Sequence, residues 1–291
     1  MSTFLARHGA KAFRMALMAA SLLMLAACQR PGPLRSESLA DGDLMRLSFP
    51  GWQADGAGHV QEVDLSALAD KNGKATASRV RATVTPVQVA KLDDAHAVML
   101  TETVPGNADA STCHTCSATM GAYFFEHDEM GWRLTARQDA VAESGAFGHL
   151  GETAITRLDG GHYAATAQWE SCWQGYCGSW LVVVGLRPDH ATRLGSAIPL
   201  TVDSDGAHAS CRALDNPKIA DDEAKSNECL DIESCWQFQG KRLIVAFEGR
   251  LSEFGKTGKL LPVRKIRQQA VYEVSQDGLK LVTGDNPVPG F

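Results

Sequence analysis

The pentapeptide Glu170-Ser171-Cys172-Trp173-Gln174 occurs a second time in this chain, as Glu233-Ser234-Cys235-Trp236-Gln237. The first copy leads into the apolar run 178–184 and the second into the run 240–246. Each run opens on a glycine and continues with residues typical of β-strands. Five matching residues with matching surroundings indicate a repeated β unit.

A fainter third copy begins at Cys116 and continues into the run 121–125. The glycines that open the three runs, at positions 121, 178 and 240, lie 57 and 62 residues apart. A period of about 60 residues is typical of stacked supersecondary units, such as propeller blades. Because radial repetition protects strand edges, a propeller of about four to five blades suits this period and length.

Most other signals in the chain are those of short strands separated by turns. Residues 80–84 alternate between polar and apolar side chains. Residues 163–169 and 179–185 are typical of the two arms of one hairpin, with a cysteine-rich loop at its tip. We therefore expect residues 46–291 to form a mainly antiparallel β domain, repeat-built and propeller-like. A β-sandwich is the alternative.

The first 28 residues carry the features of an export signal. Basic residues, and no acidic ones, precede an apolar run, 15–25, that is too short to span a membrane comfortably. The run ends in Leu25-Ala26-Ala27-Cys28, which resembles the lipobox of bacterial lipoproteins.

This resemblance implies that residues 1–27 are a signal peptide removed before Cys28, which then carries acyl chains such as palmitate. The following residue is Gln29 and not aspartate, which resembles lipoproteins sorted to the outer membrane. Residues 28–45 are rich in proline, glycine and serine and are expected to form a flexible tether. The expected location is the cell envelope, with a lipid anchor in the outer membrane and the domain facing the periplasm or the cell surface.

The charge of the chain restricts its partners. Its formal net charge is −6, and the predicted signal peptide carries three basic residues, so the mature protein is near −9. An acidic protein gains nothing from phosphate backbones, which argues against nucleic acid as a partner. The same charge argues against electrostatic docking on anionic lipid, so Cys28 is the expected link to the bilayer.

Seven cysteines follow Cys28, and export places them in an oxidising compartment, where close pairs become disulfides. We expect Cys172–Cys177 to close the hairpin loop and Cys113–Cys116 to close a tight ring. Cys211 has two candidate partners, Cys229 and Cys235. We favour Cys211–Cys229, because this bond closes the polar acidic segment and leaves the Cys-Trp repeat free.

The motif Cys113-His114-Thr115-Cys116 permits two other interpretations. A thioredoxin-like redox pair needs its first cysteine at a helix N-terminus, but a polar loop precedes Cys113. A zinc site built from both close pairs has suitable ligands, but oxidation competes with it. Structural disulfides are the favoured interpretation.

A possible calcium ligand set is suggested by Asp203-Ser204-Asp205-Gly206, which resembles the start of a calcium loop. Asp203 and Asp205 would be the ligands. No glutamate stands at the spacing of a closing ligand, so a solvated turn is the competing interpretation. Calcium and zinc are the only cofactors that the sequence suggests.

The aromatic residues around the cysteine motifs are candidates for a binding surface, and Trp173 and Tyr176 stand at the predicted hairpin tip. Tryptophan beside a disulfide more often packs locally in the core, and this is the competing interpretation. Sequence motifs for a serine nucleophile elbow, a phosphate-binding loop or a dinucleotide site are missing. We therefore expect a binding protein and not an enzyme.

The expected function is that of a membrane-anchored, non-catalytic protein-binding lipoprotein. One form is an inhibitor or immunity protein that neutralises an envelope-acting hydrolase, bound through Trp173 and Tyr176. A thiol-disulfide redox protein or zinc protein using Cys113 and Cys116 is one alternative. A structural lipoprotein of envelope assembly is the other.

Overall fold

The structure is a computed structural model, and it describes residues 34–55, 59–68, 79–106, 112–207, 228–259, 261–275 and 278–290. The chain divides into two compact units, residues 1–35 and 36–291, and every helix and strand named below belongs to the second. The predicted signal peptide, the lipidation candidate Cys28 and Cys211 lie outside the described residues.

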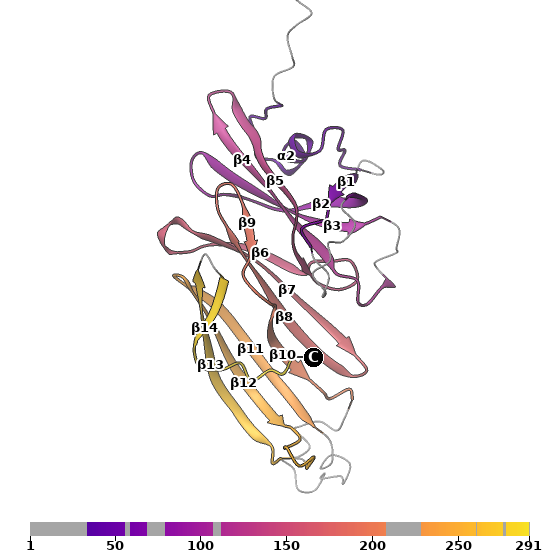
Figure 1. Ribbon diagram of the computed structural model, residues 1–291, viewed down its shortest axis with the longest axis vertical. Coiled ribbons are helices and arrows are strands. Elements are labelled where there is room, and N and C mark those ends of the chain that lie inside the picture. Colours follow the sequence, from indigo (N-terminus) through magenta and orange to yellow (C-terminus); the bar gives the residue numbers. More distant parts are fainter. Residues whose placement is uncertain are drawn as a thin grey trace, which may run out of the picture. The chain divides into compact units, whose positions relative to one another are not determined.

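The first sheet contains five antiparallel strands, each hydrogen-bonded to the next in chain order (Figure 1). They are β1 Val60–Asp64, β2 Arg79–Lys91, β3 His96–Pro105, β4 Ala118–Asp128 and β5 Gly131–Ser144. Both faces of the central strands β3 and β4 are buried. These strands therefore contain almost continuous apolar runs, as expected for strands that are covered on both sides.

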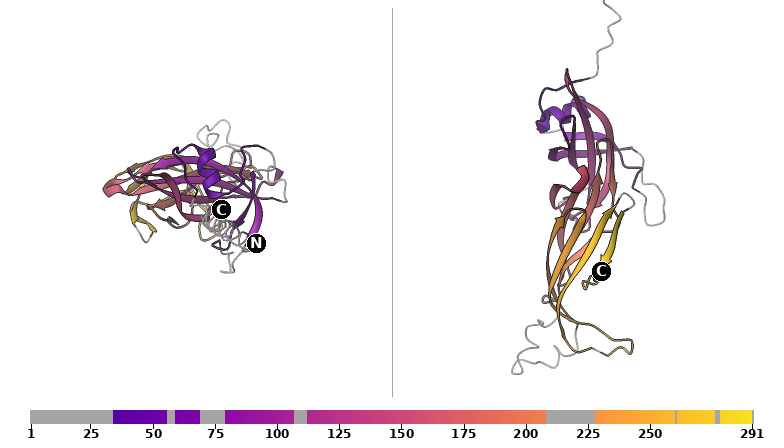
Figure 2. Two further views of the ribbon diagram at one scale, coloured as in Figure 1. Left: turned by 90° about the horizontal axis from the view of Figure 1, so that it is seen from above. Right: turned by 90° about the vertical axis from the view of Figure 1, so that its left-hand side faces the viewer.

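The second sheet contains nine antiparallel strands in the order β14-β13-β12-β11-β10-β8-β7-β6, with the short β9 paired to β8. The strands are β6 Glu152–Arg157, β7 Tyr163–Trp173, β8 Tyr176–Leu186, β9 Ala191–Arg193, β10 Ile198–Asp203, β11 Cys229–Gln239, β12 Arg242–Ser252, β13 Arg264–Ser275 and β14 Gly278–Thr283. The 3-10 turn η4 Asp159–Gly161 connects β6 to β7. Figure 2 shows that this sheet curves along its length.

Alternate residues of the central strands contribute to different hydrophobic cores. Met99 and Tyr123 pack in a cluster with residues of the helix, whereas Leu100 and Phe124 pack in a cluster that includes Val182 and Val184 of the second sheet. The two sheets thus share a core. A third cluster gathers apolar side chains of β8 and β10 to β13 within the curved sheet.

The prediction of a mainly antiparallel β protein is confirmed. Among the described residues the strands lie in sheets of five and nine, not in separate four-stranded blades, so the propeller is not shown. The predicted hairpin with arms near 163–169 and 179–185 is present as β7–β8.

The two pentapeptides occupy different places in hairpins of similar size. Hairpins β7–β8 and β11–β12 are each built from two arms of 11 residues. Cys172 stands two residues before the turn residue Gln174, whereas Cys235 stands five residues before Gly240. An odd displacement reverses the face on which a side chain lies. Equal sequence therefore does not give equal surroundings.

Residues 41–48 form the helix α2 Asp41–Ser48, although a tether was predicted as far as residue 45. That boundary was wrong, because Leu44 and Met45 of the helix are fully buried. The hydroxyl of Ser38 accepts a hydrogen bond from the backbone of Ala40 and donates one to Asp43. Burial of one apolar face holds this short, glycine-containing helix in place. No helix in the described part of the chain is long and apolar enough to cross a membrane.

A buried polar cluster ties α2 to the first sheet and joins β1 to β4 and β5 within that sheet. The carboxylate of Asp139 accepts hydrogen bonds from the Tyr123 hydroxyl at 2.7 Å, from Arg137 Nε at 2.6 Å and from the Asp64 backbone at 2.8 Å. The guanidinium of Arg137 also donates to the carbonyl of Ser48 at the end of α2. Partners on several elements thus satisfy one buried carboxylate.

Candidate partner-binding site

The tip of the β7–β8 hairpin is a tight turn closed by a disulfide. Gln174 and Gly175 both have positive φ angles, 51° and 88°, which a two-residue turn between twisted strands requires. Cys172 and Cys177 face each other across the strands and form the predicted bond. The tip is therefore held in one conformation before any partner arrives.

One face of this hairpin carries two aromatic cross-strand pairs. Trp169 lies opposite Trp180, and Trp173 lies opposite Tyr176. The first pair is stacked, with ring centroids 4.4 Å apart and an interplanar angle of 22°. Trp173 is 62% exposed, the most exposed tryptophan among the described residues. Tryptophan is enriched among the residues that contribute most to binding at protein interfaces.

An aromatic pocket of 950 Å³ lies along this face. All four aromatic residues of the two pairs line it, and Ser171 lies between the pairs along β7. Glu228 and Glu253, which flank the β11–β12 hairpin at its open end, contribute carboxylates to the lining. Its volume is within the usual range of ligand pockets, which runs from about 300 to 1,000 Å³.

The loop that contains the second disulfide forms part of the wall. Cys113 and Cys116 are bonded as predicted, and His114 between them contacts Ser171, with 2.9 Å from Nε2 to Oγ. The His114 ring also lies 5.6 Å from the Trp173 ring. Because Cys113 stands in a loop and not at a helix start, its surroundings are those of a structural bridge.

The Ser171–His114 pair is not a catalytic triad in the described residues. A nucleophilic serine needs its histidine oriented by a third group on the other ring nitrogen. The Nδ1 atom of His114 is buried and has no hydrogen-bond partner among the described residues. The contact joins the loop that contains His114 to strand β7.

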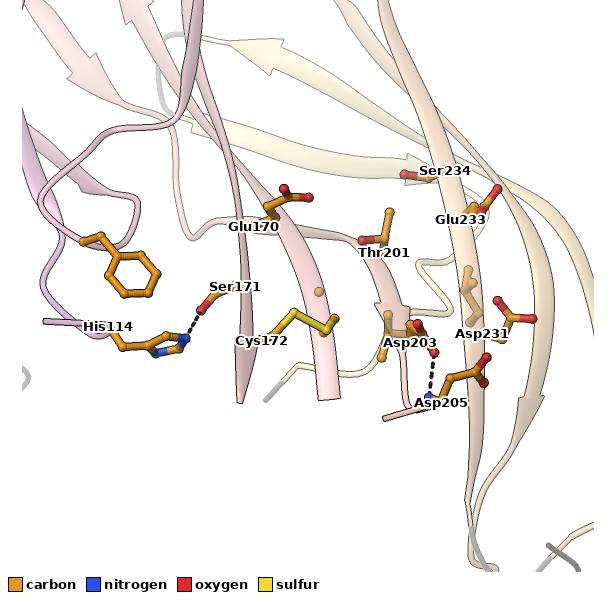
Figure 3. Close-up of a pocket in the computed structure, with 15 residues that line it drawn as sticks. His114, Glu170, Ser171, Cys172, Thr201, Asp203, Asp205, Asp231, Glu233 and Ser234 are labelled. Carbon is orange, nitrogen blue, oxygen red and sulfur yellow. Dashed lines mark hydrogen bonds between the residues drawn. A yellow bond between two sulfur atoms is a disulfide. The ribbon is translucent and has the colours of Figure 1, made fainter. Parts of the chain in front are cut away.

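A second hollow, the acidic groove, shares the lining residues His114 and Ser171 with the aromatic pocket. Figure 3 shows the residues that line this groove. Its volume is 710 Å³. Five carboxylates from β7, β10, β11 and the turn after β10 line it, and none of its lining residues is a lysine or an arginine: Glu170, Asp203, Asp205, Asp231 and Glu233. A groove lined by one sign of charge attracts the opposite charge.

The predicted calcium ligands Asp203 and Asp205 both line the acidic groove. One oxygen of Asp203 accepts a hydrogen bond of 2.7 Å from the Asp205 backbone, which is the geometry of a closed turn (Figure 3). In the described part of the chain no group of three or more histidine, cysteine or acidic side chains is arranged to hold a metal ion.

The remaining cysteines follow the predicted pattern as far as the structure describes them. Cys229 is disulfide-bonded, and its partner lies outside the described residues, as does the predicted partner Cys211. Cys235 is a free and exposed thiol. A zinc site from the two close pairs would need four thiolates, but both pairs are oxidised.

Sequence reasoning located part of this site and missed part of it. It identified Trp173 and Tyr176, which line the aromatic pocket. It did not identify Glu253 or the wall formed by His114, because no local pattern links either residue to the hairpin. Comparison with protein-family models and with curated proteins finds no match to this chain.

Proposed function

We propose that this protein is a non-catalytic binding lipoprotein of the cell envelope that captures a protein through the tip of its β7–β8 hairpin. The observation that carries the proposal is the position of Trp173. It is 62% exposed, it stands on a turn closed by the Cys172–Cys177 bond, and it borders a pocket lined by three further aromatic residues.

A rigid aromatic tip suits protein recognition for an energetic reason. Ordering a mobile loop on binding costs free energy. A turn closed by a disulfide is already ordered in the folded protein, so binding does not carry this cost. Tryptophan and tyrosine are enriched among the residues that contribute most to interface affinity. The exposed ring of Trp173 and its neighbour Tyr176 are the expected centre of contact.

The charge around the tip supports a basic partner. The acidic groove borders the aromatic pocket, and the whole chain has a net charge of −6. Complementary charge speeds association and selects partners. A cell-wall hydrolase that must bind an anionic wall is a partner of the required sign, so we propose that the lipoprotein inhibits such an enzyme.

The envelope location in this proposal rests on the sequence. The Leu25-Ala26-Ala27-Cys28 motif supports acylation of Cys28, an outer-membrane anchor and a periplasm-facing domain. Two disulfides in the described domain support an oxidising compartment. Loss of palmitate label in Cys28→Ser would support the anchor, and retention of label would contradict it.

For the fold class, we propose two packed sheets, the alternative to a propeller. The core that the five-stranded and nine-stranded sheets share supports this class. The repeated pentapeptide then marks two hairpins of equal arm length in the second sheet and not two blades.

Trp173→Ala is the direct test of the binding surface. Purified full-length protein in detergent is titrated into basic envelope hydrolases, with release of labelled peptidoglycan as the measurement. Wild-type protein should inhibit one such enzyme, and removal of a central interface tryptophan should weaken inhibition by about thirtyfold or more.

Met130→Ala is the matched control for that test. Met130 is 68% exposed and stands on the turn between β4 and β5, so the substitution removes a similarly exposed apolar side chain away from the proposed surface. This variant should inhibit as well as wild type. Equal inhibition by the Trp173→Ala protein would contradict the proposal.

A further inference from the structure

The aromatic pocket combines two features that together select one class of ligand. Its walls are π faces, because Trp169 and Trp180 form one stacked pair and Trp173 and Tyr176 form a second cross-strand pair. Its charged lining residues are Glu228 and Glu253. Aromatic faces attract cations through the negative charge of the ring face, and carboxylates do so through their full charge.

Two small residues separate the aromatic pairs on the hairpin face. Register places Ser171 opposite Gly178, directly between the Trp169–Trp180 and Trp173–Tyr176 pairs. Side chains two residues apart on a strand lie on the same face, so small residues there separate two large aromatic groups. His114 lies against Ser171 and beside the Trp173 ring, so the aromatic surface open to a flat group is the part that lines the pocket.

Among the described residues, no cationic side chain pairs with the two carboxylates of this pocket. Neither Glu228 nor Glu253 forms an ion pair with a described residue, and the pocket lining contains no lysine or arginine. The adjoining acidic groove adds carboxylates such as Glu170 and Glu233 behind the shared residue Ser171. An incoming positive charge would therefore meet attraction from both hollows.

The same lining disfavours the other ligands that stack on aromatic rings. Neutral sugars also stack on tryptophan and form hydrogen bonds with hydroxyl and carboxylate groups, but they carry no charge to compensate Glu228 and Glu253. Anionic wall peptides would be repelled by Glu228 and Glu253. A guanidinium satisfies both features, because it is planar, stacks on aromatic faces and donates hydrogen bonds to carboxylates.

We propose that this pocket is the specificity site of the partner-binding surface and that it takes a cationic side chain, an arginine in preference to a lysine, from the bound protein. This inference rests on the proposed function for the origin of that arginine. It deepens that function by naming the chemical group that the partner must present.

The test uses the full-length lipidated protein in detergent and small probes in place of the partner. The probes are an end-blocked Gly-Arg-Gly peptide, the same peptide with citrulline in place of arginine, and a chitin trisaccharide. Citrulline keeps the shape of arginine without its charge. Titration calorimetry measures affinity, and the indole signals of 15N-labelled protein locate the bound probe.

The arginine peptide should bind about tenfold or more tightly than the citrulline peptide and should shift the indole signals of the pocket tryptophans. The double variant Glu228→Gln and Glu253→Gln should lose this preference. Glu129→Gln, which removes one carboxylate charge from an exposed turn residue outside both hollows, should keep the preference. Far-UV circular dichroism of each variant establishes that it is folded.

Two results would overturn the inference. One is equal affinity for the arginine and citrulline peptides in folded protein. The other is binding of the trisaccharide at the pocket tryptophans without binding of the arginine peptide, which would make the pocket a glycan site.

Failure of this cation site is distinguishable from failure of the proposed function. If a hydrolase is inhibited through Trp173 and the double glutamine variant inhibits it equally well, the function stands and this inference is wrong. If the arginine peptide binds as expected and no basic hydrolase is inhibited, the cation site stands and the inhibitor function is wrong.

Discussion

The buried carboxylate of Asp139 connects several elements of this protein through hydrogen bonds. Its side chain is 7% exposed, and it accepts hydrogen bonds from Tyr123, Arg137 and the backbone of Asp64. Arg137 in turn packs over the ring of Phe49, 4.3 Å from its centroid. The position of α2 and β1 on the sheet therefore depends on a charge that has no contact with the candidate site.

Asp139→Asn should lower the free energy of unfolding by about 3 kcal/mol, because it leaves the half-buried charge of Arg137 without its partner. Urea unfolding followed by circular dichroism is the measurement. Glu129→Gln, an exposed position, should change the value by less than about 0.5 kcal/mol. An Asp139→Asn protein as stable as wild type would show that solvent replaces the lost partner.

Tyr123 makes the stability of the folded protein depend on pH in the alkaline range, through the polar cluster around Asp139. Burial, and then the charge of Asp139, raises the pKa of the Tyr123 phenol above its ordinary value. The folded state therefore keeps a proton that the unfolded chain loses at about pH 10. The resulting stabilisation is complete below that pH and is lost as the pH rises toward the folded pKa.

We expect the free energy of unfolding to fall above about pH 10, with this group contributing up to about 1.4 kcal/mol per pH unit. In Tyr123→Phe that contribution disappears, so its alkaline decline should be shallower. Urea unfolding at a series of alkaline pH values compares the two proteins. Parallel profiles would show that Tyr123 does not titrate on unfolding.

At the scale of elements, the β7–β8 hairpin is positioned by a close backbone contact. A Cβ atom at Gly175 would lie 2.3 Å from the backbone of Gly206 and of Ala207, in the turn that follows β10. The tip that carries Trp173 thus rests against the segment that carries Asp205. This contact brings the aromatic pocket and the acidic groove together.

Gly175→Ala should lower the free energy of unfolding by about 2 kcal/mol or more, because it adds a backbone clash to the strain of a positive φ. Gly161→Ala is the control, since Gly161 has a φ of 73° and nothing within 4 Å of an added Cβ. It should cost about 1 kcal/mol. Equal losses in thermal unfolding would mean that the turn after β10 moves aside.

At the scale of the whole molecule, the acidic charge of the protein influences how a partner approaches it. Acidic groups from β7, β10 and β11, far apart in the sequence, converge in one groove of a protein whose net charge is −6. Such a field acts on the approach of a partner before any contact forms. The proposed complex should therefore depend on salt mainly through its association rate.

We expect the association rate with a basic hydrolase to fall by about tenfold as salt rises from ~0.05 M to ~0.5 M. Replacing Asp203 and Glu233 by their amides should lower the rate at low salt and flatten this dependence. Stopped-flow fluorescence measures both. An association rate that does not change with salt concentration in the wild-type protein would show that the groove does not steer the partner.

The sequence by itself determined the local features of this protein. Strand alternation, the arms of the β7–β8 hairpin and the Cys113–Cys116 and Cys172–Cys177 bonds all depend on residues near one another in the chain. The aromatic pair Trp173 and Tyr176 at the hairpin tip could be named for the same reason. Residues that are close in sequence can adopt only a few relative arrangements in a tight hairpin turn.

Only the tertiary structure decided how these features are combined. The division into sheets of five and nine strands, the burial of α2 and the convergence of His114, Glu228 and Glu253 on the aromatic face depend on contacts between distant segments. Such contacts depend on how the faces of the sheets and the helix pack against one another. Two identical pentapeptides can therefore have different neighbours. Cys172 and Cys235 show this, since one is bridged and the other is free.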